Sequence, residues 1–132
     1  MLLFQMIVNV GMVLGVGLAR GIGALNLNTI RDIVASGRPL VGICFGHQLV
    51  AQALGGRTEK SDKGWGQGVH THTFTGSPAW HDGGSLAFNV LVSHQDQVLA
   101  LPHHAQVIAE SDFCPCFVVQ WKNHFLSIQG HP

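Results

Sequence analysis

Hydrophobic and polar residues follow the periods of a helix, a strand and a second helix in the first half of the chain. Residues 28–36, NTIRDIVAS, place three aliphatic residues on one helical face, with Asn28 as the expected N-cap. The run PLVGIC at 39–44 is apolar on both faces, which is typical of a buried parallel strand. A helical pattern resumes at 45–54 and ends before Gly55. This succession predicts an α/β layered fold.

The second half of the chain has the patterns of short strands. We predict an alternating strand at 66–74, a strand that contains a buried run at 85–94 and a further short strand at 105–111. A hairpin that turns at Lys122 and Asn123 is predicted at 116–130. Neither an internal repeat nor a low-complexity linker divides the sequence. We therefore predict a single domain over residues 1–132 with a mixed sheet.

The first 24 residues are almost wholly apolar, which allows two interpretations. A membrane span needs about 20 apolar residues, but no Lys or Arg precedes this run and no clear cleavage site follows it. We favour one or two buried strands with a glycine-rich turn, and membrane association is not expected. GLARGIG at 17–23 resembles the phosphate-binding turn of dehydrogenases whose catalysis needs a tyrosine, but the sequence has no Tyr. A plain turn is the preferred interpretation there.

Composition restricts the class of protein. With 132 residues, of which 46% are hydrophobic and 11% charged, the chain can form one core and is not a disordered chain. The formal net charge is zero and no basic stripe occurs, so binding to nucleic acid is not expected. Three cysteines without the spacing of a disulfide framework indicate a reducing compartment, and we expect the cytoplasm.

Cys44 lies where the predicted strand meets the second predicted helix, with Gly42 and Gly46 two positions away on either side. A nucleophile at such a junction occupies a sharp, strained turn that only small neighbours permit. Because a helix N-terminus favours negative charge, we expect the Cys44 thiol to ionise more readily than a free thiol. The N–H of Phe45 is then directed at a developing oxyanion. The alternative is an ordinary buried cysteine, since short motifs also occur by chance.

Four motifs in order resemble the class I glutamine amidotransferases. GICFGHQ at 42–48 resembles the nucleophile motif of that family, and KGWGQGVHT, LVSHQDQVLALP and IQGHP resemble segments of its GMP synthase-like branch. The resemblance covers residues 28–132 and leaves 1–27 as a divergent apolar segment. It implies a three-layer, flavodoxin-like mixed sheet and cysteine-dependent release of ammonia from the side-chain amide of glutamine. Some members of this branch resemble γ-glutamyl peptide hydrolases, which is the alternative function.

The resemblance also implies the roles of individual residues. Cys44 is expected to be the nucleophile, His131 its general base, and the Phe45 N–H an oxyanion donor. The residues expected to hold the amino-acid end of glutamine or of a γ-glutamyl compound are Gly46, Gln48, Ser93, His94 and Gln95. This chemistry requires no metal and no organic cofactor, and a synthase partner is expected to accept the ammonia.

Two departures from the family pattern affect the expected activity. The family places an acidic residue two positions after the histidine, and this sequence ends at Pro132, one position before it. The segment before the first predicted helix is also shorter than in family members, so we expect a fold incomplete at its N-terminus, with an unpaired sheet edge that favours self-association. Both departures predict impaired turnover, with a non-catalytic remnant as a further alternative.

Histidine and cysteine pairs, two tryptophans and one aspartate are further candidates for a chemical role. Pairs of potential metal ligands are His70 with His72, His103 with His104, and Cys114 with Cys116. None has the spacing of a zinc site, so we expect polar surface and loop residues and no metal. Trp65 and Trp80 are expected to be packing or pocket-rim residues. Asp96 either orients the substrate loop or caps a turn.

Overall fold

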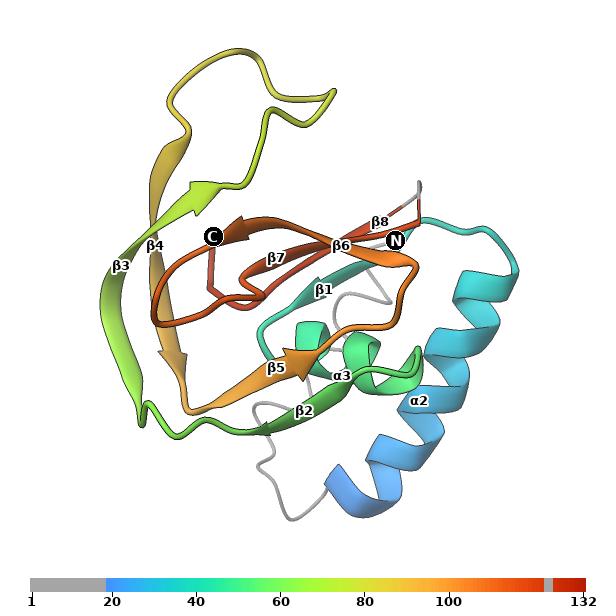
Figure 1. Cartoon of the computed structure of the whole chain (residues 1–132). Helices are drawn as coiled ribbons and strands as arrows, with labels where there is room; N and C mark the ends of the chain where they lie inside the picture. Colours follow the sequence, from blue (N-terminus) through green and yellow to red (C-terminus); the bar gives the residue numbers. More distant parts are fainter. Residues whose placement is uncertain (1–18, 123–124) are drawn as a thin grey trace.

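The computed structural model describes residues 19–122 and 125–132 (Figure 1). In chain order its elements are α2 (Ala19–Ala35), β1 (Val41–Ile43), α3 (Phe45–Ala53), β2 (Arg57–Lys60), β3 (Gly66–Phe74), β4 (Ala87–His94), β5 (Asp96–Ala100), β6 (Ala105–Glu110), β7 (Val118–Trp121) and β8 (Phe125–Ile128).

Six strands form one curled sheet in the order β1-β8-β7-β6-β3-β4, and β2 pairs with β5 in a separate ribbon. β1 runs parallel to β8, whereas the other neighbours in the sheet are antiparallel. The predicted α/β class and mixed sheet are therefore confirmed. The predicted hairpin is also present, because β7 and β8 pair antiparallel and Lys122 between them has a φ of 53°.

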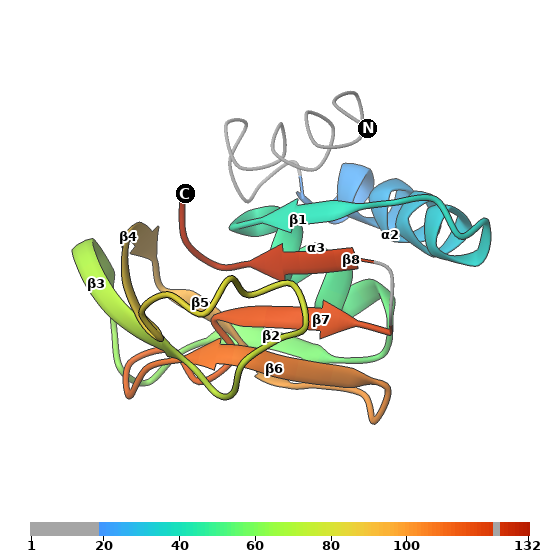
Figure 2. The same ribbon diagram turned by 90° about the horizontal axis from the view of Figure 1, so that it is seen from above.

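The main hydrophobic core lies between the two described helices and one face of the sheet (Figure 2). Ile30 and Ile33 of α2 and Val50 of α3 belong to one buried cluster with Val119 and Trp121 of β7. Alternate residues of a strand face opposite sides, so this cluster takes the odd-numbered residues of β7. Burying large apolar side chains contributes roughly 1.5–3 kcal/mol each, and here that burial fixes α3 against the strands.

A second core lies under the β3–β4 hairpin, where the sheet curls. β3 joins β6 only at its last two residues, so most of the hairpin leaves the plane of the sheet (Figure 1). Val90 and Val92 of β4 pack in a cluster with Ile108 and Phe117. At the far side of β4, the Leu91 carbonyl accepts a hydrogen bond from the His131 N–H at 2.8 Å. The end of the chain is thereby attached to the opposite edge of the curled sheet.

Helix α2 begins earlier than the sequence pattern predicted. It starts at Ala19, so Asn28 is inside the helix and is not its N-cap. The Asn28 side-chain oxygen instead accepts a hydrogen bond from Arg31 Nη1 at 3.0 Å, one helical turn away. The predicted strands over the first 24 residues and the predicted turn at 17–23 are wrong for the residues from Ala19 onward, which are helical. The remainder of both predictions falls on residues 1–18, outside the described residues.

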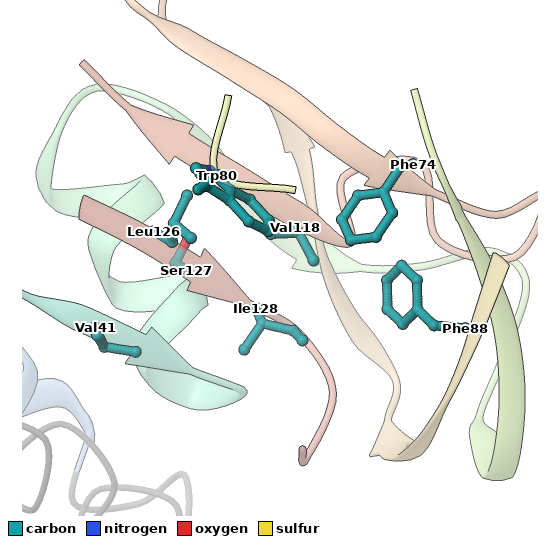
Figure 3. A pocket seen from close by; sticks show the side chains of 8 residues that line it. All are labelled: Val41, Phe74, Trp80, Phe88, Val118, Leu126, Ser127 and Ile128. Carbon is teal, nitrogen blue, oxygen red and sulfur yellow. The ribbon is translucent and has the colours of Figure 1, made fainter. Parts of the chain in front are cut away.

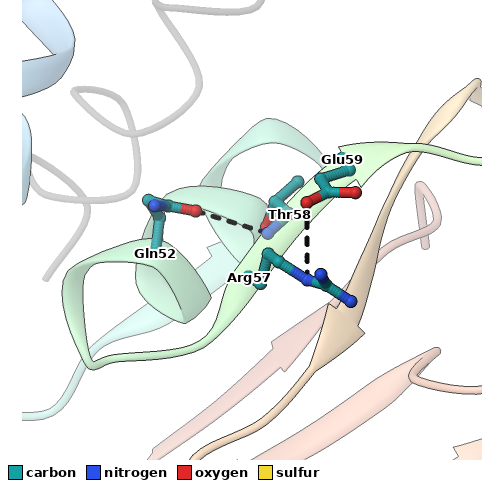
Figure 4. Close-up of polar contacts among 4 residues, drawn as sticks. All are labelled: Gln52, Arg57, Thr58 and Glu59. Atoms are coloured by element: carbon teal, nitrogen blue, oxygen red, sulfur yellow. Dashed lines mark hydrogen bonds and ion pairs between the residues drawn. The ribbon is translucent and has the colours of Figure 1, made fainter.

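The ribbon of β2 and β5 was not predicted, because β2 is the polar sequence RTEK. Its four residues pair antiparallel with β5. The Thr58 N–H donates to the Gln52 side-chain oxygen of α3 at 3.3 Å, and Arg57 and Glu59 form an ion pair at 3.4 Å (Figure 4). Exposed ion pairs contribute about 0–1 kcal/mol, so the backbone ladder and the contact with α3 hold this strand.

An apolar groove of about 250 Å³ lies on the sheet face opposite α3 (Figure 3). Leu126 and Ile128 of β8 line its floor, and Phe74 and Phe88 line one end. Trp80 lies at the rim, half-exposed, and meets Phe74 edge to face at 5.9 Å between ring centroids. Trp80 thus lines a groove, a position consistent with the packing or pocket-rim role predicted for it.

No helix in the described part of the chain combines the length and the apolar character that a membrane crossing needs.

Gly130 provides a test of the curled closure. A Cβ at Gly130 would lie 2.6 Å from Val90 Cγ1, 2.7 Å from Phe117 Cζ and 3.1 Å from the Leu91 carbonyl oxygen. We expect Gly130→Ala to lower the free energy of unfolding by about 1–3 kcal/mol, because overpacking forces the hairpin outward. Urea unfolding measures this value. In the control Gly76→Ala the added Cβ meets nothing within 4 Å, and its change should stay within about 0.5 kcal/mol. Equal changes in the two variants would contradict the closure.

Candidate active site at the ends of β1 and β8

Cys44 occupies a strained turn between β1 and α3. Its φ of 53° and ψ of −107° lie outside the regions that a non-glycine residue normally adopts. A Cβ at Gly42 would lie 2.9 Å from the carbonyl oxygen of Gly46, so glycine at position 42 is what allows the strand to turn into the helix. The predicted strand–turn–helix geometry around the cysteine is present.

The parallel pairing of β1 with β8 determines what lies beside this turn. Ile43 is the register partner of Ile128, and the Cys44 N–H donates to the Ile128 carbonyl at 2.8 Å. Parallel strands end at the same edge of a sheet, so residues 129–131 begin next to Cys44. Of these, the fully buried Gln129 reaches the cysteine, with its Nε2 3.7 Å from Cys44 Sγ.

Gln129 belongs to a buried network that extends to β5. Gln48 Nε2 donates to the Gln129 side-chain oxygen at 3.2 Å and to the Asp96 carbonyl at 3.0 Å. The same Asp96 carbonyl lies 3.1 Å from His94 Nδ1. Cys44 and the segment at 93–96 are thus joined by side-chain hydrogen bonds through Gln129 and Gln48. Asp96 takes part in these contacts through its backbone carbonyl.

The protonation of Cys44 differs from the sequence prediction. Burial raises the pKa of the Cys44 thiol above its usual range, although the Phe45 N–H and the Gln129 amide both act to lower it. The prediction that the thiol ionises more readily than a free thiol is therefore wrong. The free-energy cost of removing a thiolate from water is larger here than the stabilisation that the N-terminus of the nine-residue helix α3 provides. Burial also raises the pKa of Cys114, to about 12, and that of Cys116.

His131 presents an unsatisfied nitrogen. Its backbone is fixed to Leu91, but its Nε2 is buried and has no hydrogen-bond partner in the described part of the chain. His94 Nε2 is unsatisfied in the same way, and burial is the main reason that the pKa of His94 is lowered. A buried polar atom without a partner costs about 1–3 kcal/mol, and both ring nitrogens of His72 in β3 are in the same situation.

The other predicted site residues lie on two segments that this network connects. Gly46 and Gln48 are buried in α3. Ser93 is exposed near the end of β4, and Gln95 follows that strand, where its carbonyl accepts the Ser61 N–H at 3.1 Å. Both N–H groups of Gln48 have partners within the protein, so the side-chain amide of Gln48 also has a structural task that the sequence did not indicate.

Sequence reasoning assigned no role to two buried polar groups near Cys44. Gln129 was visible only as a letter of the IQGHP motif. The other group is His47, whose Nδ1 lies 2.7 Å from Ser127 Oγ, to which Trp121 Nε1 donates at 2.8 Å. Because the indole N–H can only donate, the Ser127 oxygen accepts from it, and the hydroxyl hydrogen is available for His47 Nδ1. Burial also lowers the pKa of His47 to about 3, so this fully buried histidine of α3 is neutral at pH 7.

The histidine and cysteine pairs considered as potential ligands lie in different parts of the fold. His70 and His72 lie two positions apart in β3, with ring centroids 6.4 Å apart. Within residues 19–122 and 125–132, no three His, Cys, Asp or Glu side chains are arranged to hold a metal ion.

The sequence as a whole matches a known family. A family model described as glutamine amidotransferase class-I covers residues 14–132. The chain belongs to the class I glutamine amidotransferases. The GICFGHQ and IQGHP motifs on which the resemblance rested both lie within the matched region.

Two relatives and one solved structure are similar to this chain. It is 33% identical over 100 residues to gamma-glutamyl peptidase 5 of Arabidopsis thaliana, covering 72% of this chain and 40% of that protein. It is 38% identical over 122 residues to one subunit of a glutamine-hydrolysing GMP synthase of Halobacterium salinarum, covering 89% of this chain and 65% of that protein. The structure of a glutamine amidotransferase from Thermotoga maritima shares the fold, with a TM-score of 0.76 at 20% identity over 83% of this chain and 47% of that one. The chain spans less than two thirds of each.

His47 predicts a pH dependence of stability. Burial lowers the pKa of His47 from 6.5 to about 3, so between these values the unfolded chain binds a proton that the folded chain does not. The free energy of unfolding should therefore fall as the pH falls from 6.5 to about 3, with His47 contributing about 1.4 kcal/mol per pH unit. His72 and His94, whose pKa values are also lowered, act in the same direction.

The His47 contribution is isolated by comparing variants. His47→Gln should reduce the slope of unfolding free energy against pH by about 1.4 kcal/mol per unit, measured by urea unfolding. The exposed His103→Gln variant should keep the wild-type slope. An unchanged slope in His47→Gln would mean that His47 is not buried as a neutral group.

Proposed function

We propose that this domain cleaves the side-chain amide of glutamine through a thioester on Cys44. The observation that carries the proposal is the strained position of Cys44, bonded through its backbone to Ile128, three residues before His131. The buried, unpartnered Nε2 of His131 supports a role in proton transfer. Family membership supports the reaction class.

The first half of the proposed reaction releases ammonia. His131 takes the proton of the Cys44 thiol, and the thiolate attacks the amide carbon, forming a C–S bond while an electron pair moves to the carbonyl oxygen. The Phe45 N–H stabilises that oxyanion. His131 then returns the proton to the amide nitrogen as the C–N bond breaks.

The second half regenerates the cysteine. His131 takes a proton from water, which attacks the thioester carbon, and delivers it to sulfur as the C–S bond breaks and glutamate leaves. Because burial raises the pKa of the Cys44 thiol, little thiolate is present at neutral pH before substrate binds, so transfer of the proton to His131 is a required step. We propose that Gly46, Gln48, Ser93, His94 and Gln95 hold the amino-acid end of the substrate.

Hydrolysis of a γ-glutamyl peptide is the second candidate, and similarity to gamma-glutamyl peptidase 5 favours it. The bond broken is again an amide of the glutamyl side chain, so the same nucleophile and base suffice. The leaving group is then an amino acid or peptide amine instead of ammonia.

For the glutaminase function we propose a synthase partner that uses the ammonia, because one relative is itself one subunit of a synthase. β1 ends the described sheet and offers an alternative surface for self-association. All three cysteines are unpaired, which suits a reducing compartment such as the cytoplasm.

Selective labelling of Cys44 tests the proposal. A glutamine-mimicking chloroketone in limiting amount should modify Cys44 in preference to Cys114 and Cys116, as mapped by mass spectrometry of peptides. Cys44→Ser should abolish the labelling and Cys116→Ser should leave it unchanged. His131→Gln should slow it about 10²-fold, since general-base assistance contributes roughly 10²–10⁴.

The same assay separates the donors and the non-catalytic alternative. Protection of Cys44 by millimolar glutamine, but not by a γ-glutamyl dipeptide, supports the glutaminase, and the reverse supports the peptidase. Labelling spread over all three cysteines, with no protection by either compound, would contradict both activities and favour a non-catalytic remnant.

A further inference from the structure

We propose that Gln129 is a catalytic residue of this domain, whose side-chain amide donates a hydrogen bond to the Cys44 sulfur and links that sulfur to the substrate segment at 93–96. The inference deepens the proposed function, because it assumes that Cys44 is the nucleophile. It rests on the buried chain of contacts among Gln129, Gln48 and the Asp96 carbonyl.

The direction of this chain follows from one backbone group. A carbonyl oxygen can only accept, so Gln48 must present its NH₂ group to the Asp96 carbonyl at 3.0 Å. The same NH₂ group lies 3.2 Å from the Gln129 side chain, which must therefore present its oxygen. The NH₂ group of Gln129 then has to face Cys44 Sγ, 3.7 Å away. The amide is oriented to stabilise a negative sulfur and not to accept from a thiol.

The same carbonyl sets the protonation of His94. His94 Nδ1 lies 3.1 Å from the Asp96 oxygen and must carry the hydrogen that the oxygen accepts. Its Nε2 is then an acceptor, and it is buried without a partner among the described residues. A displacement of the 93–96 segment on substrate binding would be transmitted through Gln48 to the amide that contacts the nucleophile.

The position of Gln129 leaves it little freedom. The side chain is fully buried, and its backbone N–H donates to the Phe117 carbonyl at 2.9 Å. The next residue is Gly130, whose close packing against Val90 and Phe117 admits no side chain. Gln129 is therefore held in place between Cys44 and His131. Its amide is already oriented before a thiolate forms, so no further loss of side-chain freedom is required at that step.

The titratable groups around Cys44 do not obscure a test by pH. Among the described residues, those on the segments that the Cys44–Gln129–Gln48 network connects are His47 in α3, His94 at the end of β4, Asp96 at the start of β5 and His131 after β8. Burial lowers the pKa of His47 to about 3 and lowers that of His94, so both are neutral in the alkaline range where the thiol titrates. His131 and Asp96 are present in the wild type and in both variants, so they do not account for a difference in midpoint between these proteins.

The test is the pH dependence of Cys44 alkylation by iodoacetamide, followed at the Cys44 peptide by mass spectrometry. Gln129→Met keeps the size of the side chain and removes the donor. Its midpoint should move up by about one pH unit, equivalent to about tenfold slower alkylation below the midpoint, because hydrogen bonds to charged groups are strong. The matched control is Gln97→Met, a glutamine equally buried whose amide donates to the Phe113 carbonyl at 3.0 Å. Its midpoint should equal that of the wild type.

Two results would overturn the inference. One is a Gln129→Met midpoint equal to that of the wild type, and the other is an equal shift in Gln97→Met, which would indicate general loosening. If Gln129→Met does not fold, nitrogen-15 NMR of the folded wild type decides. The Gln129 side-chain NH₂ signals should titrate with the Cys44 alkylation midpoint and lose that titration in Cys44→Ser, and signals that do not respond contradict the contact.

The alkylation test is independent of glutamine. A Gln129 effect without selective labelling by the glutamine-mimicking chloroketone leaves the amide contact standing and rejects the proposed function. Selective labelling with unchanged Gln129→Met kinetics rejects the contact alone.

Discussion

The site depends on the parallel pairing of β1 with β8, continued by the hydrogen bond from the Cys44 N–H to the Ile128 carbonyl. Cys44 and Gln129 are 85 residues apart in sequence, and this pairing makes them neighbours in space. It is the one parallel pair of the described six-stranded sheet. An antiparallel arrangement would place the residues after β8 at the opposite end of β1, away from Cys44.

The turn at Cys44 is held against two unfavourable terms. A non-glycine residue in a sparsely populated backbone region costs about 1–3 kcal/mol, and burial disfavours the thiolate. The backbone is held by the bond to Ile128 and by the burial of Leu49 and Val50 of α3. Within the part of the chain that the structure describes, the Phe45 N–H and the Gln129 amide act to lower the pKa of the sulfur. The surroundings therefore favour a neutral thiol and also provide two donors that would stabilise a thiolate.

Much of the fold could be predicted, because its elements follow local patterns. The apolar run ending at Cys44, the glycine pair around it and the alternation of β3 and β8 are visible in the letters of the sequence. Helix α2 was predicted too short, because Asn28 is a good N-cap and Gly21 and Gly23 are poor helix formers. β2 was missed because its polar residues form a strand only when β5 pairs with them.

The features of the site that the sequence did not predict also depend on residues that are distant in sequence. Gln129 has no distinguishing neighbour in sequence, and its contact with Cys44 exists only in the β1–β8 register. The raised pKa of Cys44 was also beyond sequence reasoning, which weighed the helix end and had no measure of burial. Motifs identified the family and proposed Cys44 and His131 as nucleophile and base, whereas strand pairing and burial determine which groups surround the Cys44 sulfur.

The most direct test of this account is a crystal structure of the chain after reaction with the glutamine-mimicking chloroketone. The account predicts electron density continuous from Cys44 Sγ into the glutamyl group, with an imidazole nitrogen of His131 within about 3–5 Å of the sulfur. A separation above about 10 Å, beyond direct proton transfer, would show that the β1–β8 pairing does not assemble the nucleophile with its base.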